Sequence, residues 1–365
     1  MPAGVSIHLR SSEHCRQLQD WLAKHAGVVV SLINMPDLIG YDDDPYPWVR
    51  WSPLQLPVHK LTRLRSLDLS CLKVQSAQGV STPSSGSASS GSSDVAAAVL
   101  PQLQELDLFE VQLSVELLSQ LLSATGLTSL DWSSVFLCSE MSPSAEDLPQ
   151  EQVLAVMWQH LQLLPKLSKL KLHINRLTLA DSVSETISPL STLQHLHHFS
   201  FRGDQPAPVY SVVHRAVAKA LLAALQHLTQ LQHLELRGCH LDWATFQQGM
   251  GYQFFSFLTA STQLTALAVN GGFGVPVPQV AFYHMFPSGR VLPNLKALRL
   301  ERLAHFTTDL CVEAAQVARI ATSCPALQEV KLSGVTHPAF DTSCLAQLPP
   351  GVTRVEGLDW VRPTP

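Results

Sequence analysis

The sequence has no run of about 18 consecutive apolar residues, the least that a membrane-spanning helix requires. Its N-terminus also has no basic segment followed by an apolar one, so it predicts no secretory leader. The formal net charge of −5 gives no general attraction to nucleic acid or to anionic lipid. We therefore expect a cytoplasmic protein that binds neither nucleic acid nor membrane.

Closely spaced cysteine pairs are also missing, although extracellular repeat proteins usually have disulfide-rich caps. Free thiols in the core of a protein from a reducing compartment explain scattered cysteines better. The seven cysteines are Cys15, Cys71, Cys138, Cys239, Cys311, Cys324 and Cys344.

Recognisable catalytic motifs are absent. No serine lies in a nucleophile-elbow sequence, and no cysteine has a catalytic sequence around it. Gly271, Gly272 and Gly274 resemble a phosphate loop, but no Lys-Ser or Lys-Thr follows and two prolines prevent the required helix. We therefore expect a turn there, no catalytic residues and no small-molecule substrate.

Two further sequence features resemble metal sites only superficially. Residues 42–44 are all aspartate, but the spaced calcium-loop pattern with a central glycine and a terminal glutamate is missing. His173, His197, His198 and His233 fall on neighbouring predicted strands within a His-rich chain. A solvated turn and surface histidines are the preferred interpretations, so we expect no metal and no cofactor.

What the sequence does have is a repeated phrase with apolar residues at positions one, four and six. Such self-similarity predicts a solenoid, in which each coil contacts only its neighbours. Ten copies occur: Leu64-Leu67-Leu69, Leu103-Leu106-Leu108, Leu127-Leu130-Trp132, Leu167-Leu170-Leu172, Leu196-Phe199-Phe201, Leu231-Leu234-Leu236, Leu264-Leu267-Val269, Leu295-Leu298-Leu300, Leu327-Val330-Leu332 and Val355-Leu358-Trp360.

Alternation at the centre of each phrase predicts a short parallel strand, and the segments between phrases show helical spacing. Residue Ser114 is placed to cap the first of these helices. The N-terminal residues 15–27 predict an amphipathic helix followed by a strand at 28–32, a degenerate first coil. The other predicted helices are 114–122, 152–164, 212–228, 243–258 and 309–323.

Residues 167–177 and 231–241 follow the pattern LxxLxLxxNxL or LxxLxLxxCxL, so the chain resembles the leucine-rich repeat family. That resemblance implies an α/β horseshoe with parallel strands on its concave face and helices on its convex face. The long, irregular repeats are more similar to the ribonuclease-inhibitor and cysteine-containing subtypes than to shorter ones. The N-terminal coil is similar to those of green-algal leucine-rich proteins, which implies a cytoskeletal or ciliary axoneme location.

Two domains are expected. Residues 1–60 form an amino-terminal cap with a Pro- and Asp-rich loop, in which Trp48 and Trp51 seal the end of the core. Residues 61–365 form the solenoid. Its insertion at 76–94 consists largely of Ser, Gly and Ala, and is expected to be a flexible loop because it cannot bury enough apolar surface to offset its ordering entropy.

The fifth position of each phrase projects from its strand, and its charges differ along the chain. Asp68, Asp107 and Asp131 predict an acidic row, since parallel strands stack about 4.8 Å apart. Further along, a basic row is predicted from Lys296, Arg299, Arg302 and Lys331. We expect reversal of the three aspartates to weaken partner binding without lowering stability. The full predicted partner-binding set is Asp68, Glu105, Asp107, Asp131, Lys171, Arg202, Glu235, Arg237, Arg299 and Lys331.

The expected function is a non-enzymatic scaffold that binds a protein partner on the concave strands. A purely solvated sheet face is the competing interpretation of these charges. Residues 317–330 resemble the repeat of F-box substrate receptors, so the substrate-recognition part of an F-box-type ubiquitin ligase is the alternative function. An enzyme with an unrecognised site is the third.

Overall fold

The chain forms two compact units, Met1–Leu167 and Ser168–Pro365. The computed structural model describes residues 3–7, 12–34, 53–76, 100–138, 148, 150–175, 187–204, 212–239, 252–271, 279–301, 312–333, 340–358 and 360–362.

In the first unit, each coil contributes one strand to a parallel sheet. The strand order follows the chain, as expected when each coil stacks on the one before it. A strand formed by Ala3–Ile7 precedes the predicted first strand and was not expected from the sequence. The members in order are β1 (Ala3–Ile7), β2 (Val29–Asn34), β4 (Ser66–Asp68), β6 (Glu105–Phe109) and β8 (Ser129–Ser133).

A second parallel sheet in the first unit was also missed by the sequence analysis. Its signal is apolar residues at positions nine and eleven of each phrase, as in Leu72 and Val74 or Val111 and Leu113, all of them buried. Polar residues alternate with them, which is the pattern of a half-buried strand. The members in order are β3 (Leu54–Leu56), β5 (Lys73–Ser76), β7 (Gln112–Ser114) and β9 (Phe136–Cys138).

Helices pack against this second sheet. Helix α1 contacts β3, α2 contacts β5 and β7, and α3 contacts β9. The predicted cap of α2 is confirmed, because the Ser114 hydroxyl accepts a hydrogen bond from the Leu117 N–H at 3.2 Å. The helical segments are α1 (Ser12–His25), η1 (Ala26–Val28), η3 (Val58–Lys60), α2 (Val115–Leu122) and α3 (Gln150–Leu161).

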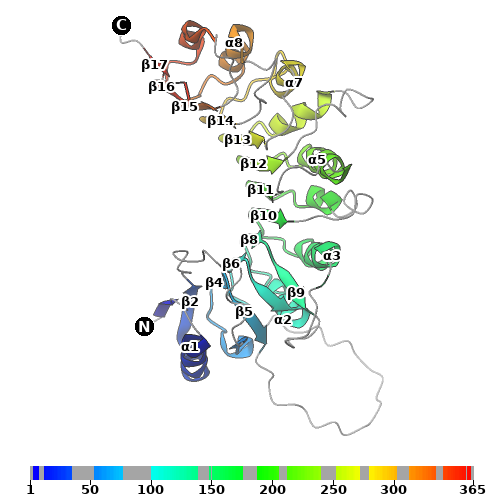
Figure 1. Ribbon diagram of the computed structural model, residues 1–365, viewed down its shortest axis with the longest axis vertical. Helices are drawn as coiled ribbons and strands as arrows, with labels where there is room; N and C mark the ends of the chain where they lie inside the picture. The colour runs from blue at the N-terminus through cyan, green and yellow to red at the C-terminus, as the bar shows by residue number, and fades with distance from the viewer. Residues whose placement is uncertain are drawn as a thin grey trace. The chain divides into compact units, whose positions relative to one another are not determined.

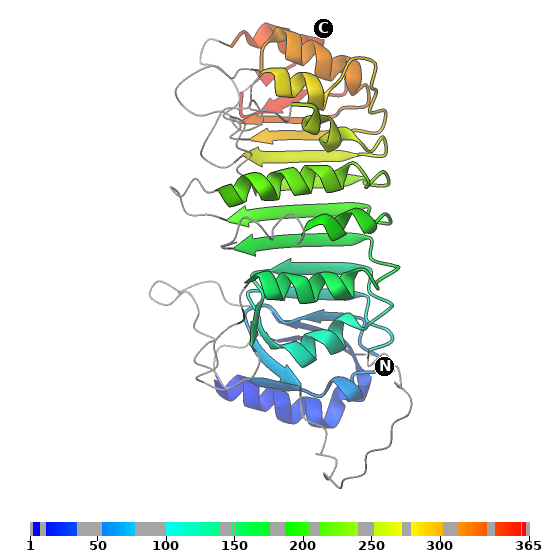
Figure 2. The ribbon, with the colours of Figure 1, turned by 90° about the vertical axis from the view of Figure 1, so that its right-hand side faces the viewer.

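The second unit has one sheet, with helical segments on one side and strands exposed on the other (Figure 1; Figure 2). All neighbouring strands are parallel except the last pair. The strands in order are β10 (Lys169–Asn175), β11 (His198–Asp204), β12 (His233–Cys239), β13 (Ala266–Gly271), β14 (Ala297–Glu301), β15 (Glu329–Ser333), β16 (Arg354–Glu356) and β17 (Trp360–Val361). The helical segments are η4 (Ser188–Thr192), α5 (Val212–Leu225), η5 (Tyr252–Thr259), α7 (Gln279–Met285), α8 (Ala314–Ser323) and η6 (Thr342–Gln347).

The α/β solenoid of stacked coils predicted from the sequence is confirmed in both units. In the first nine phrases, every residue at positions one, four and six is buried, with Val330 the most exposed at 4%. Paired strands align these residues, so that Leu234 lies beside Phe199 and Leu267. Each coil therefore buries its apolar ladder against its two neighbours.

The tenth phrase was placed wrongly. Val355 pairs with Val330, which occupies position four, so the true phrase starts three residues earlier, at Val352. Trp360 belongs instead to the short antiparallel strand β17. Arg362 follows it and donates hydrogen bonds to carbonyls of the last coil, those of Val352 and Leu348 at 2.8 Å, Pro349 at 2.9 Å and Ala346 at 3.4 Å. The chain thus closes the sheet with a hairpin.

Two predicted helices differ in type or extent. Within the predicted helix 243–258, the described segment η5 is a 3-10 helix. Its run of Tyr and Phe loses side-chain freedom in an α-helix, which explains the weaker structure. Helix α8 starts at Ala314 rather than at 309, where the Glu313 N–H donates to the Gln316 side-chain oxygen at 3.0 Å.

Several predictions lie outside the described residues: the turn at 42–44, the seal by Trp48 and Trp51, most of the insertion at 76–94, and Gly272 and Gly274. Within the described ranges, no helix combines the length and apolar character needed to cross a bilayer.

Candidate functional site

The open strand face of the first unit has the predicted acidic row. Strand pairing puts Asp68 beside Asp107, and Asp107 beside Asp131. All three side chains are half-buried, whereas Glu105 on the same face is exposed and accepts a hydrogen bond from the Ser66 hydroxyl at 3.2 Å. The row therefore brings three carboxylates onto adjacent strands.

The acidic row also has a structural role that the sequence analysis missed. Asp68 accepts a hydrogen bond from the Ser70 N–H at 2.8 Å, Asp107 accepts one from the Ser70 hydroxyl at 3.4 Å, and Asp131 accepts one from the Ser133 hydroxyl at 2.6 Å. The bonds from Ser70 tie Asp68 and Asp107 to the turn that follows β4, and the bond from Ser133 ties Asp131 to the end of β8. Each turn continues into a non-glycine residue with positive φ: Cys71 (57°), Glu110 (51°) and Ser134 (57°).

Burial and nearby negative charges raise the pKa values of several side chains in and beside these turns. Burial raises the pKa of Asp68, and the nearby Asp131 raises it further, against the hydrogen bonds from Ser70. Burial likewise raises the pKa of Glu110. The Cys71 thiol is buried beside Glu110, Asp68 and Asp107, which raises its pKa to about 12. The ionised form of Asp68 is therefore held in the fold at some cost in stability.

Replacement of Asp68 by asparagine is expected to stabilise the first unit at pH 7, by about 0.5 kcal/mol after allowance for solvent screening. Asparagine keeps the acceptor for the Ser70 N–H and removes the buried charge. Because the pKa of Asp68 is raised in the fold, its destabilising effect is present at pH values above the folded pKa. The gain should therefore shrink as pH falls through the folded pKa toward the unfolded value, as measured by urea denaturation at several pH values.

Glu105→Gln makes the same chemical change at an exposed position and serves as the control. Its unfolding midpoint should stay at that of the parent at each pH. If the gain in stability of Asp68→Asn persisted undiminished at acid pH, it could not come from removal of the buried Asp68 charge.

On the second unit, strand pairing aligns four residues of the predicted set in one row and two in the next. Arg202 and Arg237 are paired neighbours in the second row and are exposed. The first row runs through Lys171, Ser200, Glu235, Ala268, Arg299, Lys331 and Glu356. Glu356 takes the position beside Lys331 at the end of this row.

Two members of the predicted basic row are ion-paired with acids of neighbouring coils. Arg299 lies 3.4 Å from a Glu329 carboxylate oxygen, and the Lys331 ammonium lies 2.9 Å from a Glu301 oxygen. Lys296 is exposed beyond the strand, and Arg302 lies outside the described residues. Ion pairing between coils therefore offsets two of the positive charges from which the row was predicted.

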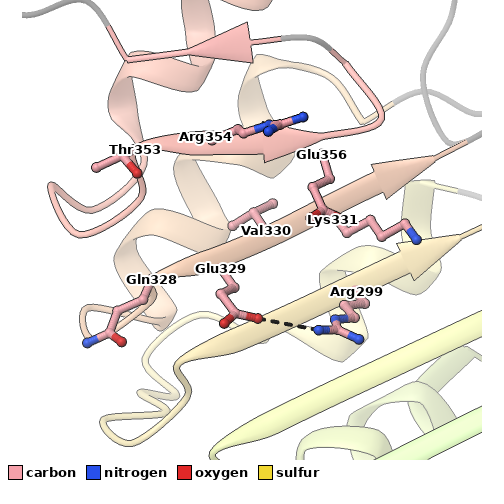
Figure 3. A pocket seen from close by; sticks show the side chains of 8 residues that line it. All are labelled: Arg299, Gln328, Glu329, Val330, Lys331, Thr353, Arg354 and Glu356. Carbon is pink, nitrogen blue, oxygen red and sulfur yellow. Dashed lines mark hydrogen bonds and ion pairs between the residues drawn. The ribbon is translucent and has the colours of Figure 1, made fainter.

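A shallow pocket of about 190 Å³ opens at this end of the face (Figure 3). Figure 3 shows Glu329 turned toward Arg299 across the pocket. The lining is polar and of mixed charge, which suits contact with a protein surface more than the apolar enclosure typical of small-ligand sites. It consists of Arg299, Gln328, Glu329, Val330, Lys331, Thr353, Arg354 and Glu356.

Two histidines of the predicted strands form a stacked pair. The His198 and His233 rings lie 4.2 Å apart between centroids and 5° from parallel. Burial, together with His233, Lys169 and Lys171, lowers the pKa of His198 to about 4, and burial also lowers that of His233. Both are thus neutral at pH 7, and no group of three potential metal ligands occurs among the described residues.

Five cysteines in the described part of the chain are free and buried. Burial raises the pKa of Cys324 to about 12, as it does with neighbouring carboxylates for Cys71. Neither thiol is a nucleophile near neutral pH, because the reactive form is the thiolate. The free cysteines are Cys15, Cys71, Cys138, Cys324 and Cys344.

The sequence matches no known family and no curated protein. Among solved structures, the chain is similar to an internalin, InlF, from Listeria monocytogenes, at 17% identity and a TM-score of 0.42, with 92% of this chain and 82% of that chain covered. It is also similar to the functional domain of InlJ from Listeria monocytogenes, which includes a cysteine ladder, at 16% identity and a TM-score of 0.30, with 88% and 65% covered.

Proposed function

We propose that the protein is a non-enzymatic scaffold that binds a protein partner on its exposed strand faces. The observation that carries this proposal is the in-register stacking of projecting side chains on neighbouring strands, opposite the helical segments. Such stacking presents rows of charged groups from a rigid support, which favours oriented encounter with a complementary surface. The predicted partner-binding residues all lie on these strands.

A cytoplasmic location is part of the same proposal, with the cytoskeleton or ciliary axoneme as its more specific form. The buried free thiols support a reducing compartment. A substrate receptor of an F-box-type ligase would use the same strand face, so that alternative stays a prediction from the sequence. The raised pKa values of Cys71 and Cys324 weigh against these two thiols as catalytic nucleophiles in the enzyme alternative.

Site-specific photocrosslinking in a native cell extract tests where the partner binds. A photoreactive amino acid replaces Ser200 or Ala268 on the strand face, and Ala155 or Lys219 on exposed helix positions as controls. We expect the strand-face positions to give one shared crosslinked protein at about tenfold the yield of the helix positions, because close contact decides crosslinking. Equal yields, or a partner crosslinked from the helices alone, would refute the proposal.

A further inference from the structure

The two charged side chains of β15 are paired on the side of the sheet away from its C-terminal end. The Glu329 carboxylate lies 3.4 Å from Arg299, and the Lys331 ammonium lies 2.9 Å from Glu301. Arg299 and Glu301 both belong to β14, whereas β16 lies on the other side of β15. Because each β15 charge is offset by a charge on β14, neither forms an ion pair with β16.

Strand β16 therefore keeps one cation and one acid without an ion pair. These are Arg354 and Glu356, and both are exposed. Within the described ranges, neither side chain has a hydrogen bond or an ion pair. Alternate residues of a strand project from the same side, so the two positions lie about 6.7 Å apart on the open face. The strand presents opposite charges to solvent at a fixed spacing.

The two neighbours of β16 give this charged pair a hollow on one side and an apolar side chain on the other. Toward β15, Arg354 and Glu356 line the pocket of about 190 Å³ (Figure 3). Toward β17, Val361 pairs directly with Arg354 and is 65% exposed. Charged and apolar contacts are thus available side by side, as at the rim of a protein interface.

We propose that this surface, which we call the β16 site, binds an extended segment of a partner protein in which one residue separates an acidic residue from a basic one. The site consists of Arg354, Glu356 and Val361. The acidic side chain pairs with Arg354, the basic one pairs with Glu356, and an apolar side chain of the segment packs on Val361. The inference rests on the proposed scaffold function and narrows it to one surface and one partner chemistry.

The spacing of the charges favours an extended peptide over other ligands. Alternate residues of an extended chain also lie about 6.7 Å apart and project to one side, whereas adjacent residues project to opposite sides. Nucleic acid carries only negative charge along its backbone, so it would place phosphate against Glu356. A free amino acid offers both charges but has no further side chain for Val361, which lies outside the pocket lining.

Fluorescence anisotropy on the full chain tests the inference in low-salt buffer, where surface charges are least screened. The probe is a short peptide of threonine and valine with an uncharged label and a central Glu-Thr-Lys. The comparison peptides have adjacent Glu-Lys, Glu-Thr-Glu or Lys-Thr-Lys, and each should bind about threefold more weakly or worse, because each satisfies only one of the two charges. Equal binding of all four peptides, or displacement of the probe by an equal concentration of free alanine, would overturn the inference.

Single charge reversals should change which peptide binds best. Arg354→Glu should prefer the Lys-Thr-Lys peptide and Glu356→Lys the Glu-Thr-Glu peptide, each by about threefold or more. Lys219→Glu and Glu116→Lys make the same charge changes at exposed helix positions, and both should keep the preference for Glu-Thr-Lys. If the β16 variants kept that preference while their circular dichroism matched the parent, the location would be refuted.

The crosslinking experiment separates this inference from the broader proposal. If Ser200 and Ala268 crosslink a partner whose capture both Arg354→Glu and Glu356→Lys leave unchanged, the scaffold function stands and the β16 site is refuted. Reduced capture by both variants, with full capture by Lys219→Glu and Glu116→Lys, supports the site. If neither position crosslinks a partner, both proposals fail.

Discussion

Substitution of Leu234 by aspartate is expected to unfold the second unit. Leu234 is 1% exposed and lies in register between Phe199 and Leu267, so the variant loses a buried apolar side chain and places an unpaired carboxylate in the core. The combined loss exceeds about 4 kcal/mol, a large part of the stability of an ordinary domain. Circular dichroism and urea denaturation should show loss of cooperative folding.

Leu234→Met keeps the apolar volume and should cost less than about 1.5 kcal/mol. If Leu234→Asp folded with the parent's unfolding midpoint, position four of the phrase would not face the core, and the alignment of the ladder would have to be rejected.

The triple variant Asp68→Lys, Asp107→Lys, Asp131→Lys is expected to lose both partner binding and stability. The aspartates accept hydrogen bonds from Ser70 and Ser133, so lysine leaves those turns without their acceptors. Hydrogen bonds to charged groups contribute about 1 kcal/mol or more each, which predicts a loss of about 2–4 kcal/mol for the first unit. The sequence alone predicts no loss, because it does not show the turns.

The matched variant with asparagine at all three positions separates the two effects. It keeps an acceptor at each site, so the fold should stay at least as stable as the parent while the charge of the acidic row is removed. Reduced partner capture by this variant would assign the acidic row to binding, measured by pull-down against the photocrosslinked partner. Full capture by both triple variants would remove the row from the binding surface.

The core was predictable because burial imposes a period that the sequence displays directly. Positions one, four and six of nine phrases are buried as expected. The tenth phrase was placed wrongly because the chain leaves the repeat there. Trp360 has the expected spacing, but it belongs to the closing hairpin. The second sheet of the first unit is visible in the sequence as alternation around positions nine and eleven, but the phrase from which the strands were predicted ends at position six.

The charge distribution of the site could not be predicted to the same extent. The row positions of Arg299 and Lys331 follow from the phrase, but their partners Glu329 and Glu301 come from neighbouring coils and other rows. Pairing between coils depends on side-chain reach, which the linear pattern does not contain. The stacked rings of His198 and His233 were placed on adjacent strands correctly, while their parallel contact emerged only in three dimensions.

The closing hairpin at the C-terminal end limits how copies of this protein can associate. The edge strand of a parallel sheet has unpaired backbone N–H and C=O groups, with which a strand of another chain can pair. Repeated pairing of this kind produces fibres. Here β17 runs against the stack and is two residues long, and Arg362 occupies carbonyls of the terminal turn. The short, antiparallel β17 therefore leaves little strand edge on which another strand could add.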